Sequence, residues 1–453
     1  MKKEGGFISP FLYSFMKKYI FPFLLGFLSL SLIGCNTQQI SVSSSNFDPT
    51  DSESISGSSI EEDCLSNVKV IKSNDLNRSE ETLVKWEGRY EYKIGDADVP
   101  NMMYLYHTAT GFTVDFYGTS LEVEFYKAST LGGTSGGGDI YYDYAIDNET
   151  LPNVNNRRFK IPSANYRYTA TLCSGLEGGH HRVKCLKMDE PADAYTAVIS
   201  FTTDGAFYYR NIEQDNSNLK VMAVCASGGS GYGSLSYSEK SGTAATRTRK
   251  NSSSLHAFNY LTARRFNADI QFVAQAGWGV KYSEEKSILD VIDKCGITPS
   301  NNVSGALTTG DWNYQNYTPD IIIFNIGGND TKKTEFNVDV YKQGVLDLVG
   351  KLHSYYPNAK MIWTHTNSKA GSYAIDALQS AGIVSQGYLK QGIIPNVGEG
   401  PTGEGTYGAS SHASFKTHLD SEAVLVDILT RWGFTPTVDD VSFDDFSFLI
   451  ERA

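Results

Sequence analysis

Cysteine and basic residues are both scarce in this chain of 453 residues. It has six cysteines, and none of them forms a close metal-ligand pair such as Cys-x-x-Cys. The 39 Lys and Arg residues are outnumbered by 51 Asp and Glu residues, which gives a formal net charge of −12 at pH 7. This balance argues against a nucleic-acid partner and against binding to anionic lipid through a basic surface.

The longest apolar run lies at the start of the chain. Lys17 and Lys18 precede the apolar segment 19–33, which ends in Leu-Ile-Gly-Cys at Cys35. This ending resembles the bacterial lipoprotein box, which implies that residues 1–35 are a lipoprotein signal peptide and that Cys35 carries the lipid. The alternative is an uncleaved anchor, for which the run is short, since a span needs about 20 residues. We expect a lipid-anchored protein of the bacterial cell envelope, facing the periplasm or the exterior.

The segment after Cys35 differs in composition from the rest of the chain. Residues 36–83 are rich in Ser, Asp, Glu and Asn and poor in apolar residues, which predicts a flexible tether. Five cysteines follow Cys35, so at least one thiol is free. Cys173 and Cys185 flank a Gly-rich turn and are candidates for a disulfide outside the cytoplasm. The sequence leaves their pairing open. Cys225 lies in an apolar strand, where burial is its expected role.

The folded part has two halves with different rhythms. Residues 84–215 show short alternating strands between Gly, Asn and Asp turns, which predicts an antiparallel β-sandwich. From residue 216 onward, strands alternate with helices, which predicts an α/β domain over 216–435 with a parallel sheet covered on both faces. The expected strands are 220–225, 270–274, 320–326 and 360–364, and the expected helices are 253–266, 335–355 and 415–432. The acidic extension 436–453 is predicted as an added strand or a solvated tail. We find no internal repeat.

Candidate catalytic residues follow several of these strands, where α/β sheets form their sites. Ser227 stands in a Gly-rich turn after the apolar run of VMAVCASGGSGYG (221–233), a setting that exposes a nucleophilic hydroxyl. His412, just before the last helix, is the candidate base. Gly277 offers a backbone N–H and Asn329 a side-chain amide for a developing oxyanion. Gly279 competes with Gly277 for that role. Together these groups predict acyl transfer.

The order Ser, Gly, Asn, His over four blocks resembles the SGNH hydrolases, the GDSL-type esterase superfamily. The segment 84–89, the turn 178–183 and the strand near Phe207 are similar to the two-domain acetylxylan esterases of carbohydrate esterase family 2. The similarity runs from about residue 84 to 433. It implies a jelly-roll sandwich followed by a flavodoxin-like SGNH domain, without metal or cofactor. It also implies hydrolysis of acetyl esters on a polysaccharide or oligosaccharide, with the Ser227 and Gly277 N–H groups and the Asn329 amide as the oxyanion hole.

The sequence departs from the family pattern at three positions. Ala226 replaces the Asp that usually precedes the nucleophile, and Ala413 replaces the Pro after the histidine. Ala409 stands where the orienting Asp is usual, which leaves His412 without its customary partner. We therefore expect a Ser227–His412 dyad with the imidazole held by a main-chain carbonyl. The alternative is a weakened or inactive homologue that serves as a glycan-binding lipoprotein.

The remaining predictions concern substrate and assembly. Trp278 and Tyr232 are the candidates for stacking on sugar rings, ahead of Trp363, which lies inside a strand. Asp330 is expected to make a structural hydrogen bond beside Asn329. An acylated lipid or a peptidoglycan sugar is the other substrate class left open. We expect a monomer.

Overall fold

The computed structural model describes residues 65–77, 82–127, 138–152, 157–163, 166–210, 218–239, 246–298 and 302–444. All of them belong to the unit formed by residues 54–453. The predictions for the signal segment, for lipidation at Cys35 and for residues 445–453 lie outside the described residues. In the described ranges, no helix is both long and apolar enough to cross a membrane.

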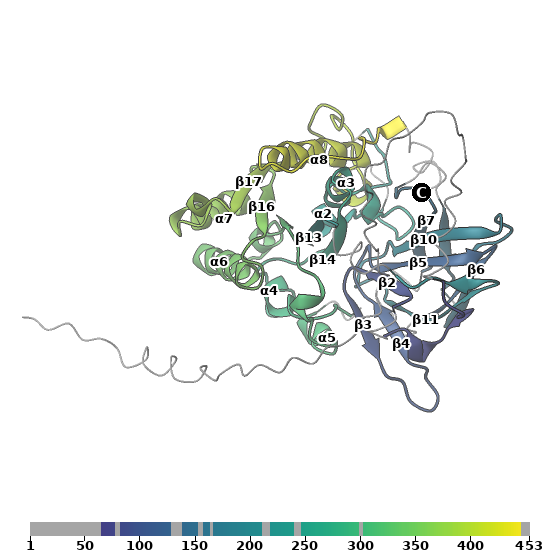
Figure 1. The fold of residues 1–453 in the computed structure, drawn as a ribbon. Coiled ribbons are helices and arrows are strands. Elements are labelled where there is room, and N and C mark those ends of the chain that lie inside the picture. Colours follow the sequence, from purple (N-terminus) through teal and green to yellow (C-terminus); the bar gives the residue numbers. More distant parts are fainter. Residues whose placement is uncertain are drawn as a thin grey trace, which may run out of the picture. The chain divides into compact units, whose positions relative to one another are not determined.

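Two antiparallel sheets form the first part of the fold, as predicted from the alternating strands (Figure 1). In the described residues, the first sheet has the order β3 (Tyr90–Lys93), β4 (Met102–Leu105), β11 (Thr196–Thr203), β6 (Leu121–Lys127), β9 (Arg167–Cys173), with β1 (Val70–Ile71) on β11. The second has the order β12 (Ala206–Phe207), β5 (Gly111–Gly118), β10 (Gly179–Lys187), β7 (Ile140–Ile146), β8 (Arg158–Ile161), with β2 (Val84–Glu87) on β5. Alternate side chains of β6 are buried, which is how each strand contributes to the core. Phe112 and Phe201 meet there edge to face at 4.8 Å.

The end of the predicted tether belongs to this sandwich instead. Val70 and Ile71 form β1 and pair with β11, and a 3₁₀ turn at Ser73–Asp75 follows. Ile71 and Leu76 are buried in the sandwich core. The tether prediction is therefore wrong for residues 65–77, because a few apolar side chains in a polar segment suffice to dock it. The other domain boundaries stay predictions.

The second part is the predicted parallel sheet, in the order β14 (Asp269–Ala274), β13 (Lys220–Cys225), β15 (Ile321–Asn325), β16 (Lys360–His365), β17 (Leu389–Ile393). Helices α3 (Phe258–Arg265) and α8 (Phe415–Thr430) pack on one face. On the other lie α4 (Ile288–Val291), α6 (Val338–Tyr355) and α7 (Lys369–Ser380). The short elements are α2 (Ser227–Ser230), α5 (Val303–Ala306), and 3₁₀ turns at Ser254–His256, Tyr314–Asn316, Asp330–Lys332, Val384–Gln386 and Ala409–Ser411. Burial on both faces explains the unbroken apolar run of β15.

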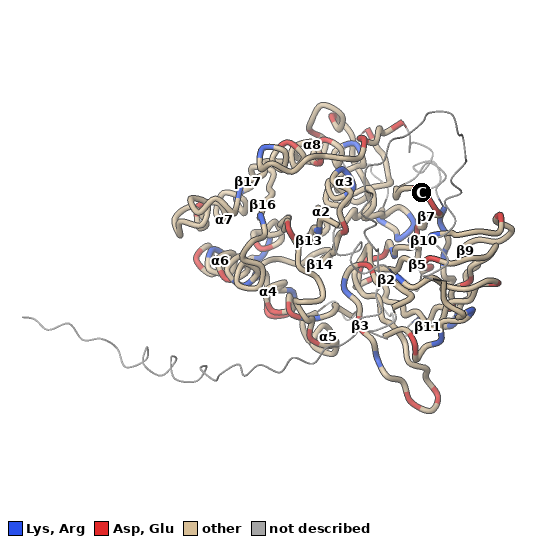
Figure 2. Tube along the Cα trace, in the orientation of Figure 1, with Lys and Arg blue, Asp and Glu red and all other residues tan. Residues whose placement is uncertain are grey.

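Both polar and apolar contacts join the sandwich to the α/β domain. Arg89 is fully buried, and its guanidinium donates to Gln271 Oε1 at 3.1 Å and to the Ile292 carbonyl at 2.6 Å. Lys85 pairs with Asp269 at 2.7 Å. Apolar side chains of β10 and of β13 belong to one buried cluster. Figure 2 shows acidic and basic positions interspersed along both parts. A buried, hydrogen-bonded cation fixes the contact between the domains, because unpairing it would be costly.

The cysteines of the described chain are buried free thiols. Cys173 ends β9 of the first sheet, and Cys185 lies in β10 of the second. The disulfide that the sequence left open is not formed. Burial raises the pKa of Cys173 to about 11 and that of Cys185 well above its usual value. The expected burial of Cys225 is confirmed. These thiols are unreactive at neutral pH.

Candidate active site

The nucleophile turn is the connection from β13 into the four-residue helix α2, with Ser227 as its first residue. Gly231 ends the helix with φ +79°, and a Cβ there would lie 2.0 Å from the Ser253 carbonyl oxygen, so only glycine fits. Ala226 takes the helix N-cap position in extended conformation and makes no side-chain cap. Its methyl group is buried in the α/β core instead. Ser227 itself is half-buried at the carboxyl edge of the sheet.

The histidine loop presents the imidazole by means of its own backbone. His412 is half-buried, and its Nδ1 lies 3.0 Å from the Ser410 carbonyl oxygen. Ser410 and Ser411 have φ of 52° and 59°, a left-handed conformation that costs a non-glycine residue about 1 kcal/mol or more. This turn aims the carbonyl at the ring. With the proton on Nδ1 donated to Ser410, Nε2 is the ring atom that can accept a proton.

Ala409 packs where the usual carboxylate was expected. It is fully buried, and its backbone N–H donates to the Gly233 carbonyl at 3.0 Å. Gly233 has φ +69°, and a Cβ on it would stand 2.6 Å from the Ala409 Cβ. The His412 loop and the nucleophile segment are thus in direct backbone contact. Ala409 supplies no carboxylate to the imidazole, so the Ser410 carbonyl is the hydrogen-bond partner of His412 Nδ1 in the described chain.

The oxyanion candidates lie on the next two loops. Asn329 follows β15, and its Nδ2 donates to the Trp278 carbonyl at 2.8 Å while its Oδ1 accepts from Lys332 Nζ at 3.2 Å. These two bonds fix the amide and leave its second proton for a ligand. Gly277 is exposed with φ +80°, and no atom lies within 4 Å of the place a Cβ would take. In the described chain its backbone N–H makes no hydrogen bond, so it is available to an approaching group.

Asp330 fastens these two loops together, which confirms its expected structural hydrogen bond. Its carboxylate accepts from the backbone N–H groups of Val280 at 2.9 Å and Lys281 at 2.8 Å. Burial raises the pKa of Asp330 to about 6. The loop that carries Gly277 and the loop that carries Asn329 are therefore held in one geometry.

The residues predicted to stack on sugar rings differ in their exposure. Trp278 is fully buried in the α/β core, so the prediction that it stacks on sugar is wrong; its carbonyl orients Asn329 instead. Trp363 is equally buried. Tyr232 is half-buried, with its ring centroid 4.5 Å from that of His412 and the Arg247 guanidinium 4.5 Å from its centre. It packs the base against the nucleophile segment, and its role in sugar binding stays a prediction.

His412 and Ser227 share this edge but are not hydrogen-bonded to each other in the described chain. Catalytic hydrogen bonds are often long without substrate and tighten in the complex. Burial is the main cause of a lowered pKa of His412, and the positive charges of Lys332 and Arg247 lower it further. The ring is therefore neutral near pH 7, the state that a general base needs. Within the described ranges, no cluster of three or more His, Cys, Asp or Glu side chains is arranged to hold a metal ion.

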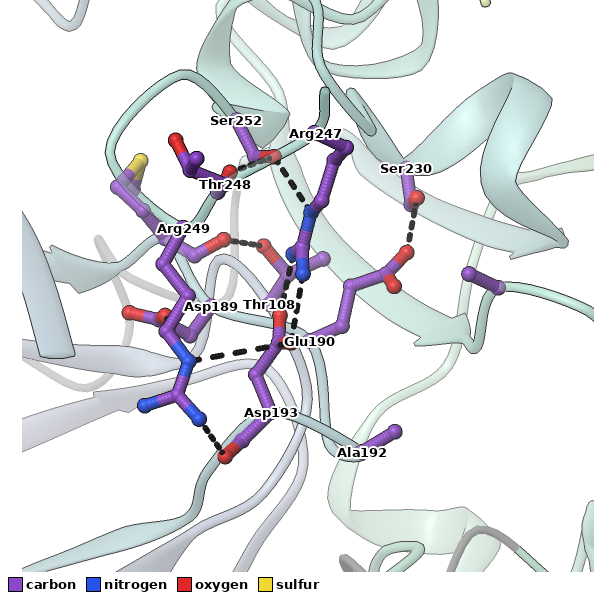
Figure 3. Close-up of polar contacts among 12 residues, drawn as sticks. Thr108, Asp189, Glu190, Ala192, Asp193, Ser230, Arg247, Thr248, Arg249 and Ser252 are labelled. Atoms are coloured by element: carbon purple, nitrogen blue, oxygen red, sulfur yellow. Dashed lines mark hydrogen bonds and ion pairs between the residues drawn. The ribbon is translucent and has the colours of Figure 1, made fainter. Parts of the chain in front are cut away.

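Two buried acidic residues beside this edge escaped the sequence analysis. Glu190 and Asp193 follow β10 of the sandwich, yet Glu190 accepts a hydrogen bond from Ser230 of α2, and Asp193 pairs with Arg247 (Figure 3). No local pattern marks them, because their partners lie 40 and 54 positions away in the sequence. Their burial between two domains could only come from the fold.

The chain is similar in sequence and in fold to several known proteins. No protein-family model matches the chain. Over 364 residues it is 24% identical to the cellulase/esterase CelE of Acetivibrio thermocellus; the match covers 75% of this chain and 40% of that protein's length. A family two carbohydrate esterase from Clostridium thermocellum, solved in complex with cellohexaose, superposes with a TM-score of 0.61 at 20% identity, over 78% of this chain and 99% of that one.

An acetyl xylan esterase from the rumen bacterium Butyrivibrio proteoclasticus superposes equally well. Its TM-score is 0.61 at 18% identity, and the match covers 81% of this chain and all of that one. Both neighbours match over the sandwich and the parallel sheet together. The chain therefore has the two-domain fold of the family two carbohydrate esterases, as the resemblance in its sequence implied.

Proposed function

We propose that this protein is a serine esterase that removes acetyl groups from O-acetylated glycans. One observation carries the proposal: the strained turn at Ser410 holds the His412 imidazole by its Nδ1, beside the nucleophile segment. Gly277 and Asn329 stand on the adjoining loops as oxyanion donors. The cellulase/esterase and the acetyl xylan esterase that resemble the chain support this choice of substrate.

The reaction follows from these positions. Ser227 Oγ attacks the acetyl carbonyl while His412 Nε2 takes the hydroxyl proton. The tetrahedral oxyanion is stabilised by the backbone N–H groups of Ser227 and Gly277 and by the Asn329 amide. The imidazolium then protonates the departing sugar oxygen. Water, deprotonated by His412, hydrolyses the acetyl-serine and releases acetate.

The dyad has a cost relative to a full triad. The Ser410 carbonyl fixes the tautomer and orientation of His412, but it carries no charge to stabilise the imidazolium. We therefore propose an enzyme slower than relatives with a triad. The test is release of acetate from acetylated xylan and from 4-nitrophenyl acetate by the purified protein. Turnover that depends on Ser227 supports the proposal, and a folded protein that releases no acetate contradicts it.

The second candidate is glycan binding without turnover. It is favoured by the uncapped Ala226 and by the absence of a Ser227–His412 hydrogen bond in the described chain. One structural neighbour was solved with cellohexaose, so this oligosaccharide is the first ligand to test. Calorimetric binding of cellohexaose by a protein with no Ser227-dependent esterase activity would establish this alternative.

We further propose that the protein is a monomer anchored by a lipid on Cys35 in a bacterial envelope. The run 19–33 and its Leu-Ile-Gly-Cys ending support the anchor. Incorporation of a labelled fatty acid into the expressed chain, and its loss in Cys35→Ala, test it. Light scattering of the delipidated protein tests the monomer.

The activity is expected to persist into mildly acidic solution. A base whose pKa lies below its usual 6.5 stays neutral, and so active, until the pH falls below that value. The acid limb of a kcat/KM profile should therefore lie below pH 6.5. Lys332→Gln removes one of the charges responsible, so it should move this limb to higher pH. Lys333→Gln, one residue further along, should leave the limb in place, and equal profiles for both variants would contradict the assignment.

A further inference from the structure

A carboxylate from the sandwich reaches the nucleophile turn. Glu190 follows β10 and is 3% exposed. Its Oε1 accepts a hydrogen bond from Ser230 Oγ, the last residue of α2 (Figure 3). The Ala276 backbone N–H faces this carboxylate and lowers its pKa, and the Ala192 N–H of the same sandwich loop donates to Gln275 Oε1 at 2.8 Å. The sandwich loop that contains Glu190 thus contacts two separate loops of the α/β domain.

The two loops are those on which ester hydrolysis would depend. Ser230 closes the helix that Ser227 opens, and Ala276 directly precedes Gly277. A helix of four residues has little stability of its own, and this one lacks a side-chain cap at Ala226. Some other contact must therefore fix its orientation. The Glu190 carboxylate provides that contact and ties it to the loop that carries the oxyanion donor.

A second carboxylate of the same sandwich loop, that of Asp193, contacts the residues that pack against His412. Asp193 forms a two-pronged pair with the guanidinium of Arg247, which stacks on Tyr232, and Tyr232 packs against His412. The Arg247 backbone N–H donates to Ser410 Oγ at 3.0 Å. The sandwich loop that contains Glu190 and Asp193 therefore contacts Ser230 of the nucleophile helix and Arg247 (Figure 3). Arg247 in turn contacts the loop that carries His412.

We propose that Glu190 is a positioning residue of the esterase site, a carboxylate supplied by the sandwich that holds Ser227 and the Gly277 N–H in register in place of the carboxylate missing at Ala226. This inference rests on the proposed function. It makes the sandwich a structural part of the hydrolytic site and not only a neighbouring domain.

The burial of Glu190 supports the assignment, because a carboxylate at this position must be desolvated, which costs free energy. Desolvation raises the pKa of Glu190 to about 7. The charged and titratable groups that face it are Arg247, Asp193, Lys187, Cys225 and Tyr232. The folded-state pKa of Glu190 exceeds its unfolded value of 4.5. The free energy of unfolding therefore falls as the pH rises from about 4.5 to 7 and Glu190 ionises. At pH 8, Glu190→Gln is therefore expected to be at least as stable as the native protein.

The test compares Glu190→Ala and Glu190→Gln by hydrolysis of 4-nitrophenyl acetate. The alanine variant should lose about 10- to 100-fold in kcat with KM within about twofold, since small misplacements of reacting groups have effects of this size. Glutamine keeps the length and an amide oxygen that can accept from Ser230 Oγ, so it should restore kcat to within about threefold. Ser230→Ala should also lower kcat, and adding it to Glu190→Ala should have little further effect.

The control is Asp115→Ala, which removes another buried sandwich carboxylate, one that pairs with Arg182 at 2.8 Å. It should leave kcat unchanged. The rate of Ser227 labelling by a fluorophosphonate gives a second readout that needs no glycan. Unchanged kcat and labelling in folded Glu190→Ala would overturn the inference while the proposed function stands. A native protein with neither Ser227-dependent turnover nor labelling would overturn both.

Discussion

Substitution of Ser227 by alanine is expected to lower kcat for ester hydrolysis by at least about 10³-fold, because the covalent route then has no nucleophile. The residual rate would come from the oxyanion donors and from substrate binding. The change should leave the fold intact, since Ser227 is half-buried and its side chain makes no hydrogen bond to another described residue. Acetate release and 4-nitrophenyl acetate turnover measure the loss, and thermal unfolding checks the fold.

The histidine variant sharpens this experiment. His412→Ala should lose nearly as much activity as Ser227→Ala, and the double variant should lose little more, because the two residues act as one unit. His181→Ala removes another half-buried imidazole, one that lies in the sandwich and pairs with Asp147 at 3.0 Å, and serves as the control. Turnover by Ser227→Ala within about tenfold of the native protein would exclude Ser227 as the nucleophile. It would also remove the basis for the dyad.

The parts of the fold with strong periodicity were predictable from the sequence. The unbroken apolar run of β15 is typical of a strand buried on both faces, and the alternation of β6 is typical of a strand buried on one face. Strand β17 and helix α7 were not predicted. β17 lies at the sheet edge with alternate residues exposed, and it contains Gln391 and Gly392, so its sequence lacks the apolar run of the inner strands.

Some residues of the candidate site could also be predicted from the sequence, and others could not. Ser227, Gly277, Asn329 and His412 follow strands or precede a helix, so topology alone brings their loops to one edge, and the fold has this topology. Trp278 was assigned wrongly because an aromatic beside a glycine gives no sign of which way its ring turns. Glu190 was missed because nothing local distinguishes it from a surface glutamate. Its partners belong to another domain, and only the assembled fold places them together.

The contacts of Ala226 and Ala409 bear on why this chain can lack the two aspartates of the SGNH pattern. Ala226 is buried in the α/β core and Ala409 is buried beside Gly233, so both positions pack a methyl group and offer no carboxylate. The imidazole is oriented by the strained carbonyl of Ser410, and the nucleophile helix is held by Glu190 from outside the α/β domain. These contacts could take the place of the two aspartates of the SGNH pattern, so they support the proposed esterase activity over glycan binding alone.

Substitution of Asn329 by alanine is expected to lower kcat about 10²- to 10³-fold with little change in KM, because its amide would bond the oxyanion only in the transition state. The amide is fixed between the Trp278 carbonyl and Lys332, so it is in position before the transition state forms. Asn337→Ala, which removes the N-cap of α6, is the matched control. It should lower the free energy of unfolding by about 1 kcal/mol and leave kcat unchanged. Equal losses of kcat in both variants would mean that Asn329 acts through the fold, and a loss seen as raised KM would place its amide on the bound substrate instead of on the transition state.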